Sequence, residues 1–366
     1  MYIHLVTDKF HLGGGLEHIF QAAAGLKDIR FRIFGQPGQQ AAVEKFKALE
    51  NVEIYNQGYQ PSLVLEKKPD LVHFHHLRPL LAFFKNPFRN YDIPIIFTAH
   101  GLHIHKYEFS RSRWRARVNY FLRFFLEKRL LAKVDKVIAV SREDRTFLEE
   151  KYGLKNVTYI ANGIDFSAPA SAAGEFTGKK ALREKLGLPV DDFLFVTVAR
   201  FHFQKGYDIL IKAIALAKEK IKERRGRFVL VGDGPEFEQM KRLSRELGVF
   251  PFIVFLGART DVYEILKACD VFLLPSRWEG LPIVLLEAGF LKVPAAASDT
   301  YGNREIIHKD SGILFNNLNS GALAGVIREV LDNKYDLASY SENLYNEVLA
   351  DYSLEKMLAG LRKIYE

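Results

Sequence analysis

Cysteine and long apolar runs are scarce in this 366-residue sequence. Cys269 is its only cysteine, which excludes an intrachain disulfide and a metal cluster built from cysteines. No run of about 18 uncharged apolar residues occurs, so the sequence predicts no membrane-spanning helix. Asp8 and Lys9 interrupt the short apolar start, and the sequence therefore predicts no secretory signal. Together these absences predict a cytoplasmic protein.

Positive charge is unevenly placed along the chain, whose net charge is +8. Residues 1–165 contain 25 Lys and Arg against 17 Asp and Glu, whereas residues 166–366 contain 27 of each. The whole excess belongs to the first part, and a chain of this length predicts two domains. The asymmetry indicates that the two domains have different tasks.

Short apolar runs alternate with helical stretches in two series. The first series predicts strands at 2–7, 30–34, 52–55, 71–74, 95–98, 137–140 and 157–160. Residues 166–180, rich in Ala, Ser, Gly and Pro, predict a linker. The second series predicts strands at 193–199, 228–231, 253–256, 271–274 and 294–297. The fold class is therefore α/β, with two Rossmann-like, doubly wound parallel-sheet domains (1–165 and 181–350) that are expected to face each other across a cleft.

Residues 270–289 are the most informative stretch. An apolar strand at 271–274 leads into a polar loop, and Pro282 then begins a helix. Free N–H groups and the helix dipole at such a sheet edge favour an anion. Glu279 and Glu287 frame the same place, and a carboxylate only accepts hydrogen bonds, which suits sugar hydroxyls. The stretch therefore predicts a nucleotide-sugar pocket.

The string P-S-x-x-E-G-L-P-x-x-L-L-E-A at 275–288 resembles the signature of the retaining glycosyltransferases of the GT-B fold, in the large family four (group 1). An E-x7-E spacing alone would equally suit a helix start that favours acidic residues; the full string is more specific. The resemblance implies that Glu279 binds the donor sugar and Glu287 the ribose. It also implies that the backbone N–H groups of Leu281, Ile283 and Val284 lie at the sugar and phosphate.

Motifs of the first domain fit the same family. Gly14-Gly15-Leu16-Glu17 resembles its G-G-x-E, which implies that Gly14 and Gly15 bind the donor and that Gly15 lies nearest the pyrophosphate. His100-Gly101 resembles its H-G, which implies that His100 contacts the donor sugar. The remaining histidines near these strand ends are interpreted as acceptor-side or surface residues: His73, His75, His76, His103 and His105. His-x-His pairs could indicate a metal, but no clustered carboxylate accompanies them, so no metal site is predicted.

Motifs of the second domain continue the match. Arg200 and Lys205-Gly206 resemble R-x4-K-G, which implies that the two cations neutralise the leaving diphosphate; a pair of solvated surface cations is the alternative. Gly232 follows the next strand and is expected near the donor, and Arg259 is expected at the nucleobase. Asn162-Gly163 is interpreted as the turn that leaves the first domain. Gly302 stands alone where the family has two glycines, which leaves the shape of that loop open.

The resemblance implies a metal- and cofactor-independent, retaining glycosyltransferase that moves a sugar from a nucleoside-diphosphate sugar to a hydroxyl acceptor. UDP-sugars are the expected donors and GDP-mannose comes next, although no residue decides between them. A covalent role for Glu279 is the rival mechanism. A nucleotide-sugar epimerase and a non-catalytic sugar- or nucleic-acid-binding protein are the alternatives, and the lack of a recognised motif speaks against nucleic acid. The final helix, within 351–366, either packs on the second domain or crosses back to the first, as in family members.

Residues 106–133 carry nine Lys and Arg against two Glu. Six apolar residues fall at helical spacing and are expected to pack on the first sheet: Trp114, Val118, Phe121, Leu122, Phe125 and Leu126. That packing leaves unexplained the alternating cations around Trp114, namely Arg111, Arg113, Arg115 and Arg117, as well as Tyr120 and Phe124. The segment therefore predicts contact of these cations and Trp114 with an anionic membrane surface, a peripheral location on its inner face, and a lipid-linked or envelope glycolipid or polysaccharide acceptor.

Overall fold

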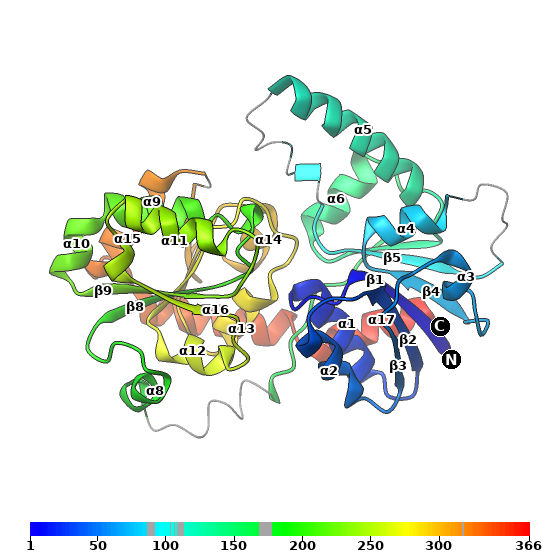
Figure 1. Ribbon diagram of the computed structural model, residues 1–366, viewed down its shortest axis with the longest axis horizontal. Coiled ribbons are helices and arrows are strands. Elements are labelled where there is room, and N and C mark those ends of the chain that lie inside the picture. The colour runs from blue at the N-terminus through cyan, green and yellow to red at the C-terminus, as the bar shows by residue number, and fades with distance from the viewer. Residues whose placement is uncertain (86–91, 103, 106, 108–112, 168–177, 317) are drawn as a thin grey trace. The chain divides into compact units, whose positions relative to one another are not determined.

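The computed structural model describes residues 1–85, 92–102, 104–105, 107, 113–167, 178–316 and 318–366. The chain forms two compact units (Figure 1). The first contains Met1–Gly163 together with Leu354–Glu366, and the second contains Ile164–Ser353. Each unit is built on one parallel sheet, so the predicted α/β class with two doubly wound sheets is confirmed.

The first unit has a seven-stranded sheet in the order β3-β2-β1-β4-β5-β6-β7. Its strands are β1 (Tyr2–Lys9), β2 (Arg30–Gln36), β3 (Val52–Tyr55), β4 (Leu71–Phe74), β5 (Ile95–Ala99), β6 (Lys136–Ala139) and β7 (Val157–Tyr159). Helices α1 (Gly14–Gly25), α2 (Gln40–Lys47) and α17 (Leu354–Tyr365) share a core on one face. Helices α3 (Pro61–Val64), α4 (Leu77–Phe83), α5 (Arg113–Leu131) and α6 (Arg142–Glu150) share a core on the other.

The second unit has a six-stranded sheet in the order β10-β9-β8-β11-β12-β13. Its strands are β8 (Phe193–Val198), β9 (Gly226–Val231), β10 (Ile253–Gly257), β11 (Val271–Leu274), β12 (Ala295–Ser298) and β13 (Ile313–Phe315). One face carries α9 (Tyr207–Leu216), α10 (Lys218–Glu223), α11 (Phe237–Glu246) and α15 (Ser320–Leu331). The other carries α12 (Val262–Ala268) and α13 (Ile283–Phe290), backed by α8 (Lys179–Leu186) and α16 (Leu337–Asp351). A short helix, α14 (Tyr301–Ile306), follows β12.

The chain changes from the first unit to the second between Gly163 and Ile164, directly after Asn162-Gly163. Most of the predicted linker lies outside the described residues, and its last two residues, Lys179 and Lys180, already belong to α8. The final helix α17 belongs to the first unit, where it packs against α1.

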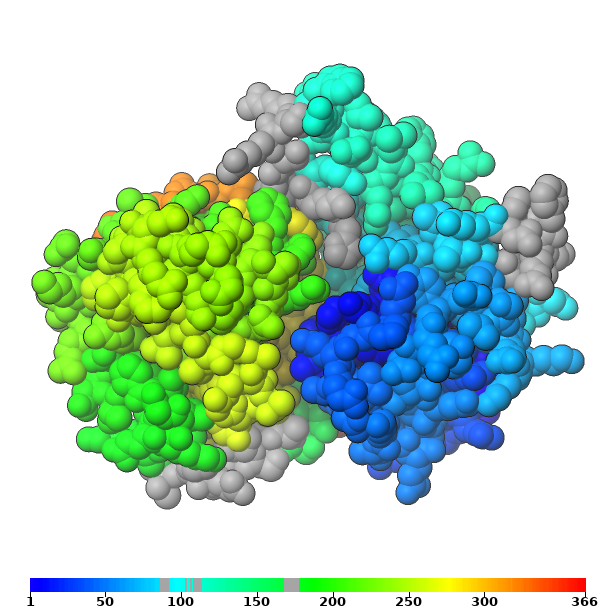
Figure 2. Space-filling view, viewed as in Figure 1, coloured from blue at the N-terminus to red at the C-terminus, as the bar shows by residue number. Residues whose placement is uncertain are grey.

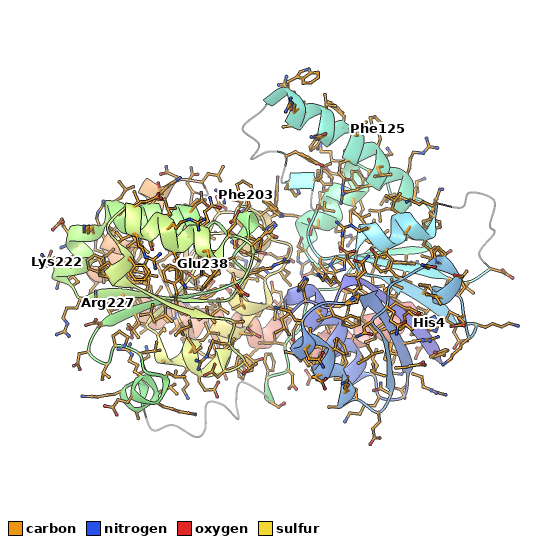
Figure 3. The ribbon with its side chains drawn as sticks, in the orientation of Figure 1. His4, Phe125, Phe203, Lys222, Arg227 and Glu238 are labelled. Carbon is orange, nitrogen blue, oxygen red and sulfur yellow. The ribbon has the colours of Figure 1, made fainter. Side chains whose placement is uncertain are left out.

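The face that α5 turns to the sheet is not the expected one. The six apolar residues expected to pack on the sheet are exposed, from 39% for Val118 to 74% for Trp114. Ala116, Glu127 and Leu130 are buried instead, and Tyr120 and Phe124 pack against the core. Figure 2 shows α5 in teal on the surface of the first unit, and Figure 3 labels Phe125 on it. The predicted packing of the six residues, defined here as the outer stripe, is therefore wrong.

Candidate active site

The strand order of the second unit reverses between β8 and β11, and the helices that follow these strands, α9 and α13, cover opposite faces of the sheet. Ligands of open α/β sheets bind outside the carboxyl ends of the strands at such a point. The loop after β8 carries Arg200 and Lys205, and the loop after β11 carries Glu279. The topology thus brings the two predicted cations and one predicted carboxylate to one edge.

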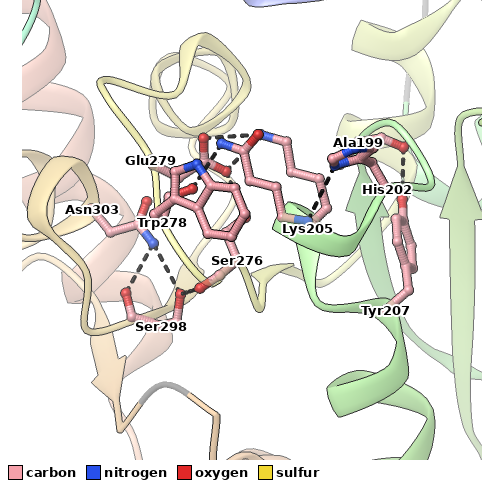
Figure 4. Close-up of polar contacts among 10 residues, drawn as sticks. Ala199, His202, Lys205, Tyr207, Ser276, Trp278, Glu279, Ser298 and Asn303 are labelled. Atoms are coloured by element: carbon pink, nitrogen blue, oxygen red, sulfur yellow. Dashed lines mark hydrogen bonds and ion pairs between the residues drawn. The ribbon is translucent and has the colours of Figure 1, made fainter. Parts of the chain in front are cut away.

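Lys205 and Glu279 form a direct ion pair (Figure 4). The Lys205 ammonium donates to both carboxylate oxygens of Glu279, at 2.6 and 2.9 Å. The Ser276 hydroxyl donates to Glu279 Oε1 at 2.5 Å. The Glu279 side chain is only 6% exposed and that of Lys205 21%, so the pair is largely shielded from water. The sequence predicted both residues but neither their contact nor the participation of Ser276.

Further hydrogen bonds join the two loops. Gln204 Nε2 donates to the carbonyl of Trp278 at 2.9 Å, and the Arg277 N–H donates to the carbonyl of Gln204 at 2.7 Å. The Arg277 guanidinium binds Asp208 at 2.8 Å and lies over the Phe203 ring. These contacts fix Lys205 and Glu279 relative to each other before any ligand arrives.

Two glycines allow the loops to approach so closely. Gly206 has φ +68°, and a Cβ there would lie 2.0 Å from the carbonyl oxygen of Pro275. A Cβ on Gly302 would lie 1.7 Å from the carbonyl oxygen of Gly280. Asn303 holds the same region by donating to the Ser298 carbonyl at 2.9 Å. The single glycine of this loop, whose shape the sequence left open, therefore stands where a side chain would clash.

Helix α13 completes this edge. Ile283 and Val284 are its first residues, and Leu281 lies just before the N-cap residue Pro282. Glu287 is half-buried on α13 and accepts a hydrogen bond from the Tyr263 hydroxyl at 3.3 Å. The free amides of a helix start favour an anion beside these carboxylates.

The remaining predicted donor residues of the second unit lie on neighbouring loops. Gly232 follows β9, and its backbone packs against that of Ala199. Arg200 is exposed, and its charge, with that of Lys205, adds to burial in lowering the pKa of His202. Arg259 follows β10 and pairs with Asp261. The loop at 200–205 is therefore positively charged, whereas Arg259 is already partnered.

The first unit gathers its predicted residues at the carboxyl edge of its own sheet. Gly14 and Gly15 begin α1, and a Cβ on Gly15 would lie 3.6 Å from His100 Cδ2 and 3.9 Å from His76 Cε1. A cavity of about 230 Å³ opens beside His100 and His76, and Asp8, Arg78, Arg123 and Glu127 also line it. Asp8 accepts from Arg78 at 2.9 Å and from the Tyr59 hydroxyl at 2.8 Å.

Five histidines cluster at this cavity, and three of them, His75, His76 and His100, line it; the other two are His18 and His73. His73 and His75 are 0% and 3% exposed, so the surface interpretation of these two is wrong, and it is wrong for His105 at 5%. His103 lies outside the described residues. Burial lowers the pKa of His18 to about 4 and holds those of His73 and His75 well below their usual range. Among the described residues, no group of three or more His, Cys, Asp or Glu side chains is arranged to hold a metal.

The residues predicted for membrane contact lie at the start of α5. Arg113 begins the helix, Trp114 is 74% exposed, and Arg115 and Arg117 are exposed. Arg111 lies outside the described residues. No helix in the described part of the chain combines the length and apolar character that a membrane crossing requires.

Comparison with known proteins adds independent information. Residues 178–347 match the family model described as glycosyl transferases group 1, and residues 51–168 match that described as glycosyltransferase family 4. The chain is 31% identical over 246 residues to EpsD of Bacillus subtilis (strain 168), a match that spans 66% of this chain and 61% of EpsD. It is 28% identical over 311 residues to the UDP-Gal:alpha-D-GlcNAc-diphosphoundecaprenol alpha-1,3-galactosyltransferase of Escherichia coli, covering 83% of this chain and 76% of that protein.

A solved structure shares the whole fold. Anabaena Alr3699/HepE in complex with UDP-glucose superposes with a TM-score of 0.80 at 19% identity, covering 100% of this chain and 99% of that one. The two family models, matched one after the other, cover most of both units. The order of motifs along the chain and the two parallel sheets agree with this match. The chain therefore belongs to the group 1 glycosyltransferases of the GT-B fold.

Proposed function

We propose that this glycosyltransferase moves a sugar from a nucleoside-diphosphate sugar to a hydroxyl acceptor with retention of the anomeric configuration. The observation that carries the proposal is the shielded Lys205–Glu279 pair beside the start of α13. Cations and helix amides suit the diphosphate, and Glu279 and Glu287 suit sugar hydroxyls. Glu287 would bind the ribose, and Arg259 would contact the base.

Charge on the leaving group determines the roles of these residues. As the bond between the sugar and the diphosphate breaks, negative charge grows on the β-phosphate. Arg200, Lys205 and the amides at Leu281, Ile283 and Val284 would stabilise that charge without a metal ion. The acceptor hydroxyl would attack from the face that the diphosphate leaves, and its proton would pass to the departing phosphate oxygen. Glu279, held by Lys205 and Ser276, would bind the sugar hydroxyls rather than attack the anomeric carbon.

The donor we propose is a UDP-sugar. The name of the E. coli relative specifies UDP-Gal, and HepE was solved with UDP-glucose. GDP-mannose is the next candidate. Gly14 and Gly15 would bind the pyrophosphate of the donor, and His100 would contact the donor sugar.

The first unit would bind the acceptor. Its cavity offers both hydrogen-bond acceptors and donors at fixed places, because Asp8 is held by Arg78 and Tyr59, and Arg123 is paired with Glu127. Fixed carboxylate–guanidinium pairs of this kind suit the hydroxyls of a sugar acceptor.

The outer stripe of α5 favours an acceptor at a membrane. Trp114, Phe121, Leu122 and Phe125 are each at least 58% exposed on one helix face, and cations accompany them. An apolar face with basic flanks partitions into the interface of an anionic bilayer. We therefore propose peripheral docking on the inner leaflet and a lipid-linked or envelope glycolipid or polysaccharide acceptor, which agrees with the diphosphoundecaprenol in the name of the E. coli relative.

Acceptor-dependent release of nucleoside diphosphate tests the proposed reaction. UDP- and GDP-sugars are offered singly, with and without an extract of membrane lipids, and free diphosphate is measured in the presence of a chelator. We expect release from one donor only when acceptor is present, and undiminished by the chelator. Interconversion of the sugar without acceptor would support an epimerase instead, and a strict need for Mg²⁺ would contradict the role given to the cations.

A further inference from the structure

His75 touches the residue that the proposed function places at the donor sugar. His75 follows β4, His100 follows β5, and the two strands are neighbours in the first sheet. His75 Nδ1 and His100 Nε2 lie 2.9 Å apart, and the ring planes differ by only 19°. This geometry is that of an in-plane N–H···N hydrogen bond, in which one ring donates and the other accepts.

The surroundings of His75 decide which ring donates. His75 is 3% exposed, and its Nε2 is buried without a hydrogen-bond partner among the described residues. If Nε2 carried the proton, an N–H group would be buried unpaired, which proteins avoid more strictly than an unpaired acceptor. The proton of neutral His75 therefore belongs on Nδ1, from which it is donated to His100 Nε2. His100 must then carry its own proton on Nδ1.

Neighbouring groups hold the two rings in place. His73 lies against His75 with ring centroids 4.2 Å apart, and His73 is itself fixed by Thr98 at 2.7 Å and by the Tyr365 hydroxyl of α17 at 2.9 Å. His18 meets His100 edge to face and is bound to Asn162 at 3.0 Å. Burial keeps the pKa of His75 well below its usual range, with the neighbouring histidines adding to the effect, so the ring stays neutral.

We propose that His75 is a positioning residue that fixes the ring plane and the tautomer of His100. His100 Nε2 is occupied as an acceptor, so any hydrogen bond that His100 makes through Nδ1 is one that it donates. His100 would therefore act on the donor sugar as a hydrogen-bond donor and not as a base through Nε2. The assignment of the sugar contact rests on the proposed function, whereas the tautomer does not.

Nitrogen NMR of the full-length protein tests the tautomer directly. The His100 ring signals are identified by their loss in His100→Gln, and their shifts show which nitrogen carries the proton at neutral pH. We expect the proton on Nδ1 in the wild-type protein and a mixture of tautomers in His75→Leu. A proton on Nε2 in the wild type, or an identical pattern in His75→Leu, would overturn the inference whether or not the protein transfers sugar.

Kinetics of two matched variants test the positioning role. His75→Leu should lower kcat by about 10–100-fold, the range for loss of a partner that orients a histidine, with little change in KM for the donor. His75→Asn keeps a donor near the Nδ1 position and should recover most of the activity. Tyr365→Phe removes one buried hydrogen bond from the same cluster and should leave both kcat and the His100 tautomer unchanged. Equal losses of kcat in His75→Asn and His75→Leu, or the same loss of kcat in Tyr365→Phe, would show that His75 has only a structural role. If the wild-type protein has no transferase activity, the proposed function is refuted. The NMR experiment then still decides the tautomer of His100.

Discussion

At the scale of single residues, the ion pair with Glu279 holds Lys205, one of the two cations that we expect to stabilise the leaving diphosphate. We expect Lys205→Ala and Arg200→Ala each to lower turnover by about 10²–10³-fold, the cost of removing one preorganised donor. Steady-state kinetics on variants with unchanged thermal unfolding measures this. Near-normal turnover in a folded variant would show that the substituted residue does not stabilise the leaving diphosphate.

Glu287 is expected to act in binding rather than in turnover. Glu287→Ala should weaken the affinity for free nucleoside diphosphate by about 1.5–3 kcal/mol, the range for hydrogen bonds to a charged group. Tyr263→Phe is the matched control, because it removes only the hydroxyl that lies 3.3 Å from the Glu287 carboxylate. Calorimetry compares the two. If both variants bind like the wild type, Glu287 does not hold the ribose.

The motifs pointed to Lys205 and Glu279 one by one, but nothing in the sequence indicated their contact. Lys205 and Glu279 are separated by 74 positions, and their pairing depends on the hydrogen bonds of Gln204 and on the space left by Gly206. The sequence placed His75 near a strand end but gave no sign of its contact with His100. His75 follows β4 and His100 follows β5, and the pairing of these two strands, which brings the residues together, cannot be seen in the sequence.

At the scale of elements, α5 shows where periodicity misleads. The outer stripe is the more apolar face and was expected to pack on the sheet, yet Ala116, Tyr120, Phe124 and Glu127 also fall at helical spacing on the face that packs. The Tyr152 hydroxyl donates to the Glu127 carboxylate at 2.7 Å. Sequence alone does not reveal that partner, because Tyr152 follows α6, 25 residues further along the chain.

The outer stripe predicts how the protein meets lipid. Sedimentation with vesicles should show binding that requires anionic lipid and falls as salt rises. The double variant Arg115→Ser/Arg117→Ser should bind more weakly, by about 1 kcal/mol for each cation removed. Phe121→Ser/Leu122→Ser/Phe125→Ser should lower binding roughly 100-fold if each side chain contributes about 1 kcal/mol. Leu216→Ser, which changes a 55% exposed residue of the second unit, is the control and should bind normally. Equal binding to neutral vesicles would contradict the proposed surface.

The histidine cluster predicts how the first unit responds to acid. The folded-state pKa of His18 is about 4 and lies below the ordinary value of 6.5, so the unfolded chain binds a proton that the folded one does not. The contribution of neutral His18 to the free energy of unfolding is therefore present above pH 6.5 and is lost as pH falls toward 4. It amounts to about 3 kcal/mol for His18 alone. Hydrogen-exchange protection of β1 and β4 should fall between pH 7.5 and 5, and less so in His18→Gln. The same protection at both pH values would refute this account; His308→Gln, on an exposed side chain, serves as control.

At the scale of the whole molecule, both sheets were predictable because their strands are apolar runs bounded by turns. The exception was β13, whose three residues, Ile313–Phe315, are too few to stand out from a loop. The place of α17 in the first unit was also beyond sequence reasoning, because its apolar spacing would suit either domain. It is settled by contacts such as the hydrogen bond between Tyr365 and His73.

The anomeric configuration of the product tests directly whether the protein transfers the sugar with retention. The full-length protein is given the UDP-sugar that passes the release assay together with its acceptor, and the coupling constant of the anomeric proton is read by NMR in donor and product. We expect the same anomeric configuration in both, with product formed without metal and its rate of formation lowered about 10²–10³-fold in Lys205→Ala. An inverted product would contradict transfer with retention.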